Sequence, residues 1–306
     1  MGCARVADPQ IIGTADGSHP SWGKSVHVWI VRSGALGDFV CTLPVLQALR
    51  RHAGHLTVVS NPRYRPLFPS ADRWVHPDGT EALGLFAGSM DLSGVALGVA
   101  WTRASGEALT RCGVPRVLVG EPEPPPGESM VVHLAGILHP LSIVVTEVPK
   151  ASPDPGSLAA VGARLTAAGV DAPVVIAPGS GGAVKRWPLS AWRRVAARLQ
   201  AAGVPVVWVG GPLEREEGGW GSPRLDDLDV AGLLALARLS GAWLGPDAGP
   251  GHVAAAAGAR VGVVFNGTTD PRCWAPPGAE VFAGDASPDS LASWALAARC
   301  AGHASG

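Results

Sequence analysis

Lysine is scarce in this sequence. Among the 24 basic residues of the 306-residue chain, only Lys24, Lys150 and Lys185 are lysines, and arginine supplies the rest. The formal net charge is -1, so the chain lacks the basic excess of a nucleic-acid-binding protein, and its charge will not hold it on an anionic membrane. We therefore expect no nucleic-acid partner, leave peripheral membrane contact open, and consider each lysine a candidate functional residue.

Cysteine is also sparse, and long apolar runs are absent. The five cysteines are scattered and never stand in a C-x-x-C spacing, which excludes a disulfide framework or a zinc ribbon and favours reduced thiols in the cytoplasm. No apolar run reaches the roughly 18 residues that a membrane-spanning helix needs. Residues 1–24 lack the apolar centre of a signal peptide, and we interpret them as a flexible leader.

Short β-branched runs alternate with Ala-, Leu- and Arg-rich stretches of helical spacing. The first half begins with a predicted strand at 27–32, a helix that ends near Arg51 and a strand at 56–60, and further apolar runs follow at 95–100 and 116–119. Because strands alternate with helices and no hairpin turns intervene, the pattern predicts an α/β fold with a parallel sheet covered on both faces.

A proline-rich break separates two such series. Three prolines and a glycine in segment 149–156 cannot continue a helix or a central strand. The alternation then restarts, with predicted strands at 174–177, 204–210, 242–245 and 261–265.

The break divides the chain into two expected domains of similar size. We expect the first over 25–150 and the second over 151–287, followed by a last helix within 288–306. Ligands of such folds bind beyond the carboxyl ends of the strands, and a cleft between two such domains is the expected site.

The first candidate site is RSGALGD, directly after the strand at 27–32. Gly34 and Gly37 allow a tight turn and a close approach to a ligand, and Asp38 follows at the start of a helix. A single carboxylate at a strand end suits a lone general base. The alternative is that Asp38 is only the N-cap of the helix.

The second candidate is APGSGGAVKRWP, again a strand, a glycine-rich loop and a helix. Ser180, Gly181 and Gly182 are placed to cradle a phosphate at the helix N-terminus, and Lys185 adds a positive charge. The loop is neither a P-loop nor G-x-G-x-x-G, because Val184 stands where both patterns need glycine. The alternative is a solvated lysine on a flexible loop.

The third candidate is GPDAGPGHVAAAAG, where Asp247 follows a strand and His252 opens an Ala-rich helix. Small residues between them admit a ligand close to the backbone, and the helix N-terminus favours an anion. Two further segments are weaker. Acids after the glycines at 210–211 could bind ribose hydroxyls or be ordinary helix-start acids, and the loop 265–278, with Thr268, Thr269 and Asp270, could contact phosphate or be a simple turn.

These segments, in this order and spacing, resemble the family 9 glycosyltransferases, the ADP-heptose:lipopolysaccharide heptosyltransferase family. The similar stretches are RSGALGDFVCTLPVLQALR, APGSGGAVKRWPLSAWRRVAARL, VGGPLERE and LGPDAGPGHVAAAAGARVGVVFNGTTDP, which lie within 28–271. The resemblance implies a GT-B fold, in which two Rossmann-like, doubly wound domains face a central cleft. The first would bind the acceptor and the second the nucleotide sugar, and the last helix would cross back to the first.

The resemblance also implies roles for single residues. Asp38 matches the catalytic base, and Lys185 matches the lysine on the donor diphosphate. Asp247, Gly249 and His252 match the donor motif D-[ST]-G-x-x-H, with Ala248 in place of its hydroxyl residue.

Two further matches concern the rest of the donor. Glu214 matches the residue that binds the nucleotide ribose. Glu216 is the alternative match if the alignment is shifted by two residues. The family's F-G-x-T reads Phe265-Asn266-Gly267-Thr268 here, a shift of one residue, and Thr268 is a further candidate donor contact.

The combined prediction is an inverting, metal-independent glycosyltransferase without a cofactor. Asp38 would deprotonate the acceptor hydroxyl, while Lys185, the 180–182 amides and the helix near His252 would stabilise the leaving diphosphate. The donor would be a nucleotide-linked heptose or related sugar, with ADP as the expected nucleotide, and the acceptor a glycan, a lipopolysaccharide core or a small metabolite. The alternatives are a non-catalytic nucleotide- or sugar-binding protein and a dinucleotide oxidoreductase, and the missing G-x-G-x-x-G disfavours the latter.

Overall fold

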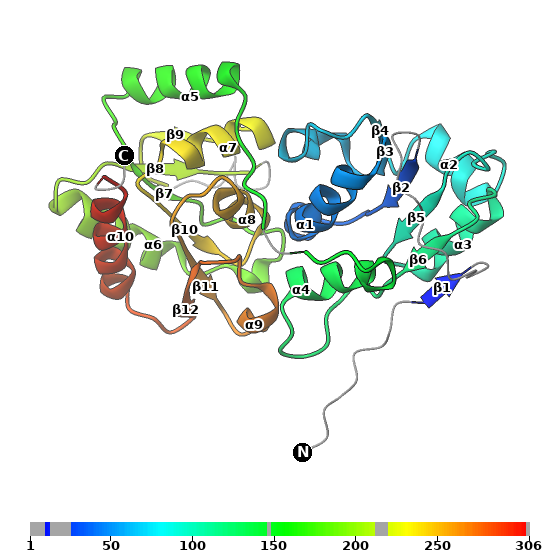
Figure 1. Ribbon diagram of the computed structural model, residues 1–306. Helices are drawn as coiled ribbons and strands as arrows, with labels where there is room; N and C mark the ends of the chain where they lie inside the picture. The colour runs from blue at the N-terminus through cyan, green and yellow to red at the C-terminus, as the bar shows by residue number, and fades with distance from the viewer. Residues whose placement is uncertain (1–9, 13–25, 146–147, 212–219, 304–306) are drawn as a thin grey trace. The chain divides into compact units, whose positions relative to one another are not determined.

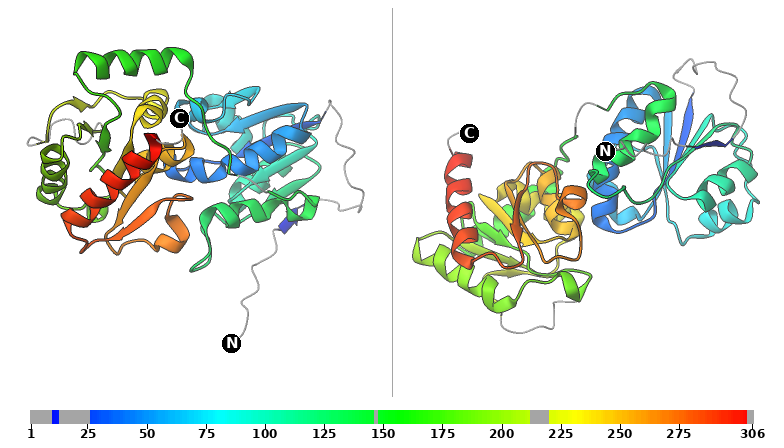
Figure 2. Two further views of the ribbon diagram at one scale, coloured as in Figure 1. Left: turned by 60° about the vertical axis from the view of Figure 1, so that its left-hand side comes forward. Right: turned by 90° about the horizontal axis from the view of Figure 1, so that it is seen from below.

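The computed structural model describes residues 10–12, 26–145, 148–211 and 220–303 (Figure 1). The chain divides into two compact units, Met1–Pro149 and Lys150–Gly306, and the division falls at the start of the proline-rich break. In the part of the chain that is described, each unit contains one six-stranded sheet with helices on both faces (Figure 2). The predicted α/β fold with two Rossmann-like, doubly wound units is confirmed.

The first unit has the strand order β1-β6-β5-β2-β3-β4. Its central strand β2 (His27–Val31) pairs in parallel with β3 (His55–Val59) on one side and with β5 (Leu97–Ala100) on the other. β4 (Arg73–Val75) and β6 (Val117–Val119) extend the sheet outward, also in parallel. The chain winds from β2 to β4 and then returns to β5, so the strand order reverses between β2 and β5.

The strand β1 (Gln10–Ile12) lies antiparallel on the outer edge of β6. Its residues fall within the segment 1–24 that was expected to be a flexible leader, and that prediction is wrong for residues 10–12. The physical reason is the open edge of β6, whose unpaired backbone groups accept a further strand. The remaining residues of the predicted leader lie outside the described part.

The helices of the first unit form two layers. α1 (Leu36–His52) packs against α4 (Met130–Ala135) on one face of the sheet, and α2 (Thr80–Ala87) packs against α3 (Arg103–Arg111) on the other (Figures 1 and 2). Two 3-10 helices lie in the connections, η1 (Pro62–Leu67) and η2 (Gly136–Leu141).

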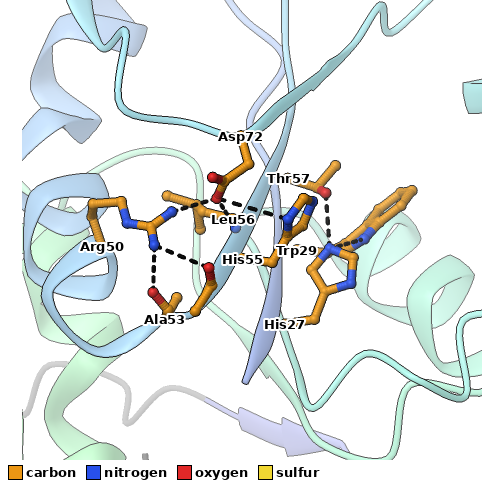
Figure 3. Close-up of polar contacts among 9 residues, drawn as sticks. His27, Trp29, Arg50, Ala53, His55, Leu56, Thr57 and Asp72 are labelled. Carbon is orange, nitrogen blue, oxygen red and sulfur yellow. Dashed lines mark hydrogen bonds and ion pairs between the residues drawn. The ribbon is translucent and has the colours of Figure 1, made fainter. Parts of the chain in front are cut away.

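Polar side chains join the amino-terminal ends of β2 and β3 to the end of α1 (Figure 3). Arg50 bonds the carbonyl oxygens just beyond α1 and pairs with Asp72, which also accepts the Leu56 N–H at 2.7 Å. Beside them, His27 Nε2 accepts the Trp29 indole N–H at 3.1 Å. Burial and the neighbouring imidazole of the next strand lower the pKa of His27, which agrees with a neutral ring. This network closes the helix terminus and lies at the sheet edge opposite to the strand carboxyl ends.

The second unit repeats the architecture with the order β12-β11-β10-β7-β8-β9. All neighbouring strands are parallel, and the order reverses between β7 and β10. The strands are β7 (Val174–Ile176), β8 (Val206–Val209), β9 (Arg224–Leu225), β10 (Ala242–Pro246), β11 (Val261–Phe265) and β12 (Glu280–Ala283).

Helices again cover both faces of this sheet. α6 (Leu189–Ala201) packs against α10 (Pro288–His303) on one face, while α5 (Pro155–Ala167), α7 (Val230–Leu239) and α8 (Gly249–Ala256) lie on the other (Figure 2). The contacts of α10 with α6 and β10 place this helix in the second unit. Its expected crossing to the first domain stays a prediction. The short η3 (Ala183–Lys185) and α9 (Pro271–Trp274) lie in loops.

Tryptophan fills the centre of both units. Trp29 and Trp101 are fully buried in the first unit, and Trp192, Trp208 and Trp243 in the second. Large aromatic side chains bury much apolar surface each, so the abundance of tryptophan is explained in part by core packing. Among the described residues, no helix is both long enough and apolar enough to span a membrane.

Candidate functional site

In the second unit, four candidate side chains meet at the point where the strand order reverses. Asp247 directly follows β10, and the loop that carries Lys185 follows β7. Lys185 Nζ donates to Asp247 Oδ2 at 2.7 Å, and Thr269 Oγ1 donates to the same oxygen at 2.7 Å. His252 Nε2 lies 3.9 Å from Asp247 Oδ1. The sequence prediction had placed three of these residues together in one site, and the structure brings them into contact.

The cluster keeps Asp247 ionised. The carboxyl group is 5% exposed, and burial alone would raise its pKa. Contacts from His252, Lys185 and Thr269 outweigh burial and lower the pKa of Asp247 to about 2. The ionised Asp247 in turn fixes the Lys185 ammonium group in one place, while about a third of the lysine side chain stays exposed.

The amino-terminal end of α8 lies beside this cluster. α8 begins at Gly249 after the N-cap residue Ala248, whose side chain makes no capping hydrogen bond. Pro250 has no N–H, and the Gly251 N–H donates to the Ala248 carbonyl oxygen at 3.0 Å, so Gly249 is the first-turn residue whose amide is left to meet an anion, which the helix dipole also favours. His252 is buried within this first turn. Ala248 offers no hydroxyl at this position.

The loop that carries Lys185 is held by Asn266. The Asn266 amide Nδ2 donates to the carbonyl oxygens of Val184 at 3.3 Å and Arg186 at 3.4 Å. Gly284 permits this arrangement, since a Cβ at Gly284 would lie 2.4 Å from Asn266 Oδ1. Asn266 thus ties the lysine loop to the end of β11.

The glycine-rich part of the same loop is open. Ser180 is buried, and its Oγ lies 3.4 Å from the Gly182 amide nitrogen, which donates to it. Gly181 is exposed and has no neighbour where a side chain would begin. A phosphate could therefore approach this part of the backbone closely.

In the first unit, Asp38 lies at the carboxyl end of β2. The N-cap of α1 is Ala35, and Asp38 stands three residues later, so the alternative of Asp38 as the N-cap has the wrong position, but Asp38 does help to cap the start of α1. Its Oδ2 accepts the Ala35 N–H at 2.9 Å. The side chain is 26% exposed, and its Oδ1 has Arg32 Nη2 3.9 Å away. One oxygen is therefore fixed by the backbone, and the other faces the guanidinium group of Arg32.

Gly34 fits this turn for a steric reason. Its φ is +152°, and a Cβ there would lie 3.0 Å from Asp38 Oδ2. A larger residue would push against the carboxylate. Gly37 lies in the first turn of α1, one residue before Asp38.

The sequence missed Tyr64, the one tyrosine of the chain. Tyr64 lies in η1, its hydroxyl donates to the Gly34 carbonyl oxygen at 3.3 Å, and its ring packs on Phe39 with centroids 5.3 Å apart. Burial and the charge of Asp38 raise the pKa of the Tyr64 hydroxyl, which keeps it protonated. No sequence motif contains Tyr64, so the sequence alone could not predict that it lies near Asp38.

Two other expectations have different outcomes. The hydroxyl that reaches Asp247 belongs to Thr269, and the expected donor contact of its neighbour Thr268 stays a prediction. Glu214 and Glu216 lie outside the described residues.

The sequence also contains a D-x-D pattern, Asp227-Leu228-Asp229, which the expectation of metal independence did not take into account. Asp229 caps α7 by accepting the Gly232 N–H at 2.8 Å, and Asp227 pairs with Arg164 at 2.8 Å. Within the described ranges, no group of three or more His, Cys, Asp or Glu side chains is arranged to hold a metal ion.

The fold has solved relatives. A family 9 glycosyl transferase from Veillonella parvula superposes with a TM-score of 0.75 at 16% identity, over 90% of this chain and 98% of that one. The ADP-heptose lps heptosyltransferase II of E. coli gives 0.72 at 15% identity, over 91% and 100%. The iron-containing dodecameric glycosyltransferase TibC of enterotoxigenic E. coli gives 0.54 at 15% identity, over 83% and 62%. At such identities these likenesses establish the fold alone.

The sequence itself establishes the family. No curated protein matches the chain. The sequence profile of glycosyltransferase family 9 (heptosyltransferase), however, matches residues 123–283, slightly more than half of the chain. The match contains Lys185, Asp247 and His252. It begins at residue 123 and therefore does not include Asp38. The chain therefore belongs to glycosyltransferase family 9, the heptosyltransferase family, and is a glycosyltransferase.

Proposed function

We propose that this glycosyltransferase moves a heptose or a related sugar from an ADP-linked donor to an acceptor hydroxyl, with inversion and without a metal ion. The observation that carries the proposal is the Lys185–Asp247 pair in front of the first turn of α8. A cation held by a buried carboxylate beside the positive end of a helix dipole suits a diphosphate. The named relatives support a heptose donor, since one of them is an ADP-heptose lps heptosyltransferase.

On the donor side, Lys185 and the helix amides stabilise the negative charge that develops on the departing diphosphate. Asp247 acts as a positioning residue, because it holds the lysine and does not itself attract an anion. Thr269 completes the hydrogen bonds to Asp247 Oδ2. Glu214 or Glu216 would bind the ribose, as the resemblance implies.

On the acceptor side, Asp38 takes a proton from the attacking hydroxyl through Oδ1. The acceptor oxygen forms a bond to the anomeric carbon while the bond from that carbon to the diphosphate oxygen breaks, and the electron pair leaves with the nucleotide. Attack opposite to the leaving group inverts the anomeric configuration. The acceptor is a hydroxyl of a glycan, a lipopolysaccharide core or a small metabolite.

The test compares donors and then follows the reaction. ADP-, GDP-, UDP- and dTDP-sugars are screened for protection against thermal unfolding, because a ligand that binds only the folded state raises the melting temperature. We expect the ADP-sugar to protect most. A larger shift with another nucleotide would reject the ADP assignment.

Metal independence is tested on the same preparation. Donor consumption and the anomeric configuration of the product are followed by NMR with and without EDTA. We expect an inverted product and equal rates in both. Since the structural relative TibC is described as iron-containing, a loss of activity with EDTA that iron restores would contradict this part of the proposal.

The sequence left open a non-catalytic binding protein on the same fold, an alternative that membership of a glycosyltransferase family disfavours. The discriminating result is the release of free nucleotide from the sugar donor. Donor protection with no nucleotide release, over a panel of acceptors, would favour binding without turnover.

A further inference from the structure

The first unit contains a buried cation that the mechanism above does not use. Arg32 directly follows β2, and Trp101 directly follows β5. These are the two strands between which the strand order reverses. In open α/β sheets, ligands bind outside the carboxyl ends of the strands at this position. Arg32 therefore lies where the topology of the first unit predicts a ligand.

The guanidinium group of Arg32 is buried without matching acceptors. The residue is 5% exposed, and its Nε is enclosed without a hydrogen-bond partner among the described residues. The nearest carboxylate oxygen of the described part, Asp38 Oδ1, is 3.9 Å from Nη2, too far for a hydrogen bond. Burial lowers the pKa of Arg32, which reflects the cost of keeping a cation away from water.

The side chain is nevertheless held in place. Its guanidinium carbon lies 5.6 Å from the ring centroid of Trp101, within the range of a cation–π contact. The side chain keeps 6% of its surface exposed, and of its nitrogens only Nε is among the enclosed atoms that lack a partner. The result is a fixed, largely desolvated fork of N–H donors at the switch point.

We propose that Arg32 binds an oxyanion, a carboxylate or a phosphate carried by the acceptor, beside Asp38. A planar guanidinium donates two parallel hydrogen bonds to such a group and gains most where water is scarce. The cation also offsets the repulsion between the arriving anion and the Asp38 carboxylate. This inference deepens the proposed function, because it gives the acceptor a chemical class, an anionic glycan or metabolite.

The test measures anion binding to the protein alone, without a sugar donor, so that no glycosyl transfer takes place. Inorganic phosphate and sodium acetate are titrated separately into 15N-labelled Lys185→Ala protein, in which the expected donor phosphate site is impaired. The signal is the indole N–H resonance of Trp101, assigned by its loss in Trp101→Phe. We expect a saturable shift with at least one anion, and about tenfold or more weaker binding after Arg32→Gln, the scale of lost charge-assisted hydrogen bonds.

Controls and contrary results separate the alternatives. Arg73→Gln removes the same charge at the amino-terminal end of β4 and should leave the titration unchanged. A response to phosphate alone assigns a phosphate group, whereas a response to acetate includes a carboxylate. No shift of Trp101 with either anion, or an equal shift after Arg32→Gln, would overturn the proposal.

A second variant covers a loss of folding. If Arg32→Gln does not fold, Arg32→Lys is titrated in its place, because lysine keeps the positive charge but cannot donate two parallel hydrogen bonds. We expect weaker anion binding in this variant. An anion affinity equal to that of the protein with Arg32 would reject the proposal. Because no nucleotide sugar is used, a failure of the donor screen leaves this result valid.

Discussion

At the scale of single residues, Asp38 is expected to decide turnover. Asp38→Asn keeps the shape of the side chain and can still accept the Ala35 N–H through its amide oxygen, but it cannot accept a proton from the acceptor hydroxyl. General-base removal costs on the order of 10²–10⁴-fold in rate, so we expect kcat to fall by that factor while ADP affinity is unchanged. Turnover is measured from ADP release and affinity by calorimetry. A variant that turns over at nearly the normal rate would reject Asp38 as the base.

Asp247 is expected to show its role in the pH dependence of stability. Its pKa is about 2 in the folded protein against 3.8 for an unperturbed aspartate. A lowered folded-state pKa gives stability that is fully present above the unfolded pKa and is lost as pH falls through the folded pKa. The difference corresponds to about 2 kcal/mol of unfolding free energy at neutral pH.

The measurement compares urea unfolding of the unsubstituted protein and Asp247→Asn from pH 7 to pH 2. We expect the unsubstituted protein to be more stable by about 2 kcal/mol at pH 7 and the gap to close between about pH 4 and pH 2. Other acids that also titrate, such as Asp289, contribute equally to both proteins and cancel in the difference. A gap that does not change with pH would contradict the assigned ionisation of Asp247.

Sequence reasoning found those site residues that follow a strand directly or belong to a local motif. Asp38, Lys185 and Asp247 are of this kind, because the carboxyl ends of parallel strands meet at one edge of a sheet. Tyr64 was missed, and the bond from Thr269 to Asp247 was not foreseen, because both contacts cross between loops that are distant along the chain. Such contacts depend on loop conformation, which no spacing in the sequence encodes.

At the scale of elements, the loop before α6 depends on the end of β11. Asn266→Ala removes two hydrogen bonds to the backbone around Lys185. Since a hydrogen bond contributes about 1 kcal/mol net, we expect ADP affinity to fall by roughly 5- to 30-fold, with the melting temperature almost unchanged. Asn61→Ala, which removes the N-cap contact of η1 in the first unit, is the matched control. Unchanged ADP affinity in Asn266→Ala would show that the loop keeps its shape without Asn266.

Strands and helices were predictable where the apolar pattern was long and buried. The predicted strand at 261–265 is β11 with the same bounds, and all of its residues are buried. The edge strand β12 was missed, because three of its four residues are exposed and an edge strand carries no continuous apolar run. β1 was missed for a related reason: three residues within a polar segment form a strand only because β6 offers an edge.

At the scale of the whole molecule, the two units repeat one architecture, and the proposed function divides the donor and the acceptor between them. In both, the order of the strands reverses beside the first strand of the parallel series, and in both the candidate residues lie at that reversal. The sequence predicted two domains from the break at 149–156, and it also predicted which one binds which substrate, although only through the family resemblance.

The proposed assignment of the donor to the second unit and of the acceptor to the first predicts where ADP should slow hydrogen exchange. Saturating ADP should slow amide exchange in the loop 177–186 and in the first turn of α8, because the diphosphate is expected to bind these amides and a ligand suppresses local opening. The segment 32–38 in the first unit should exchange at an unchanged rate. Lys185→Ala should abolish the protection at the same ADP concentration, while Lys150→Ala, which removes an equal charge elsewhere in the second unit, should preserve it. Protection of 32–38 without protection of the α8 turn would place the nucleotide on the first unit and reverse the assignment of donor and acceptor.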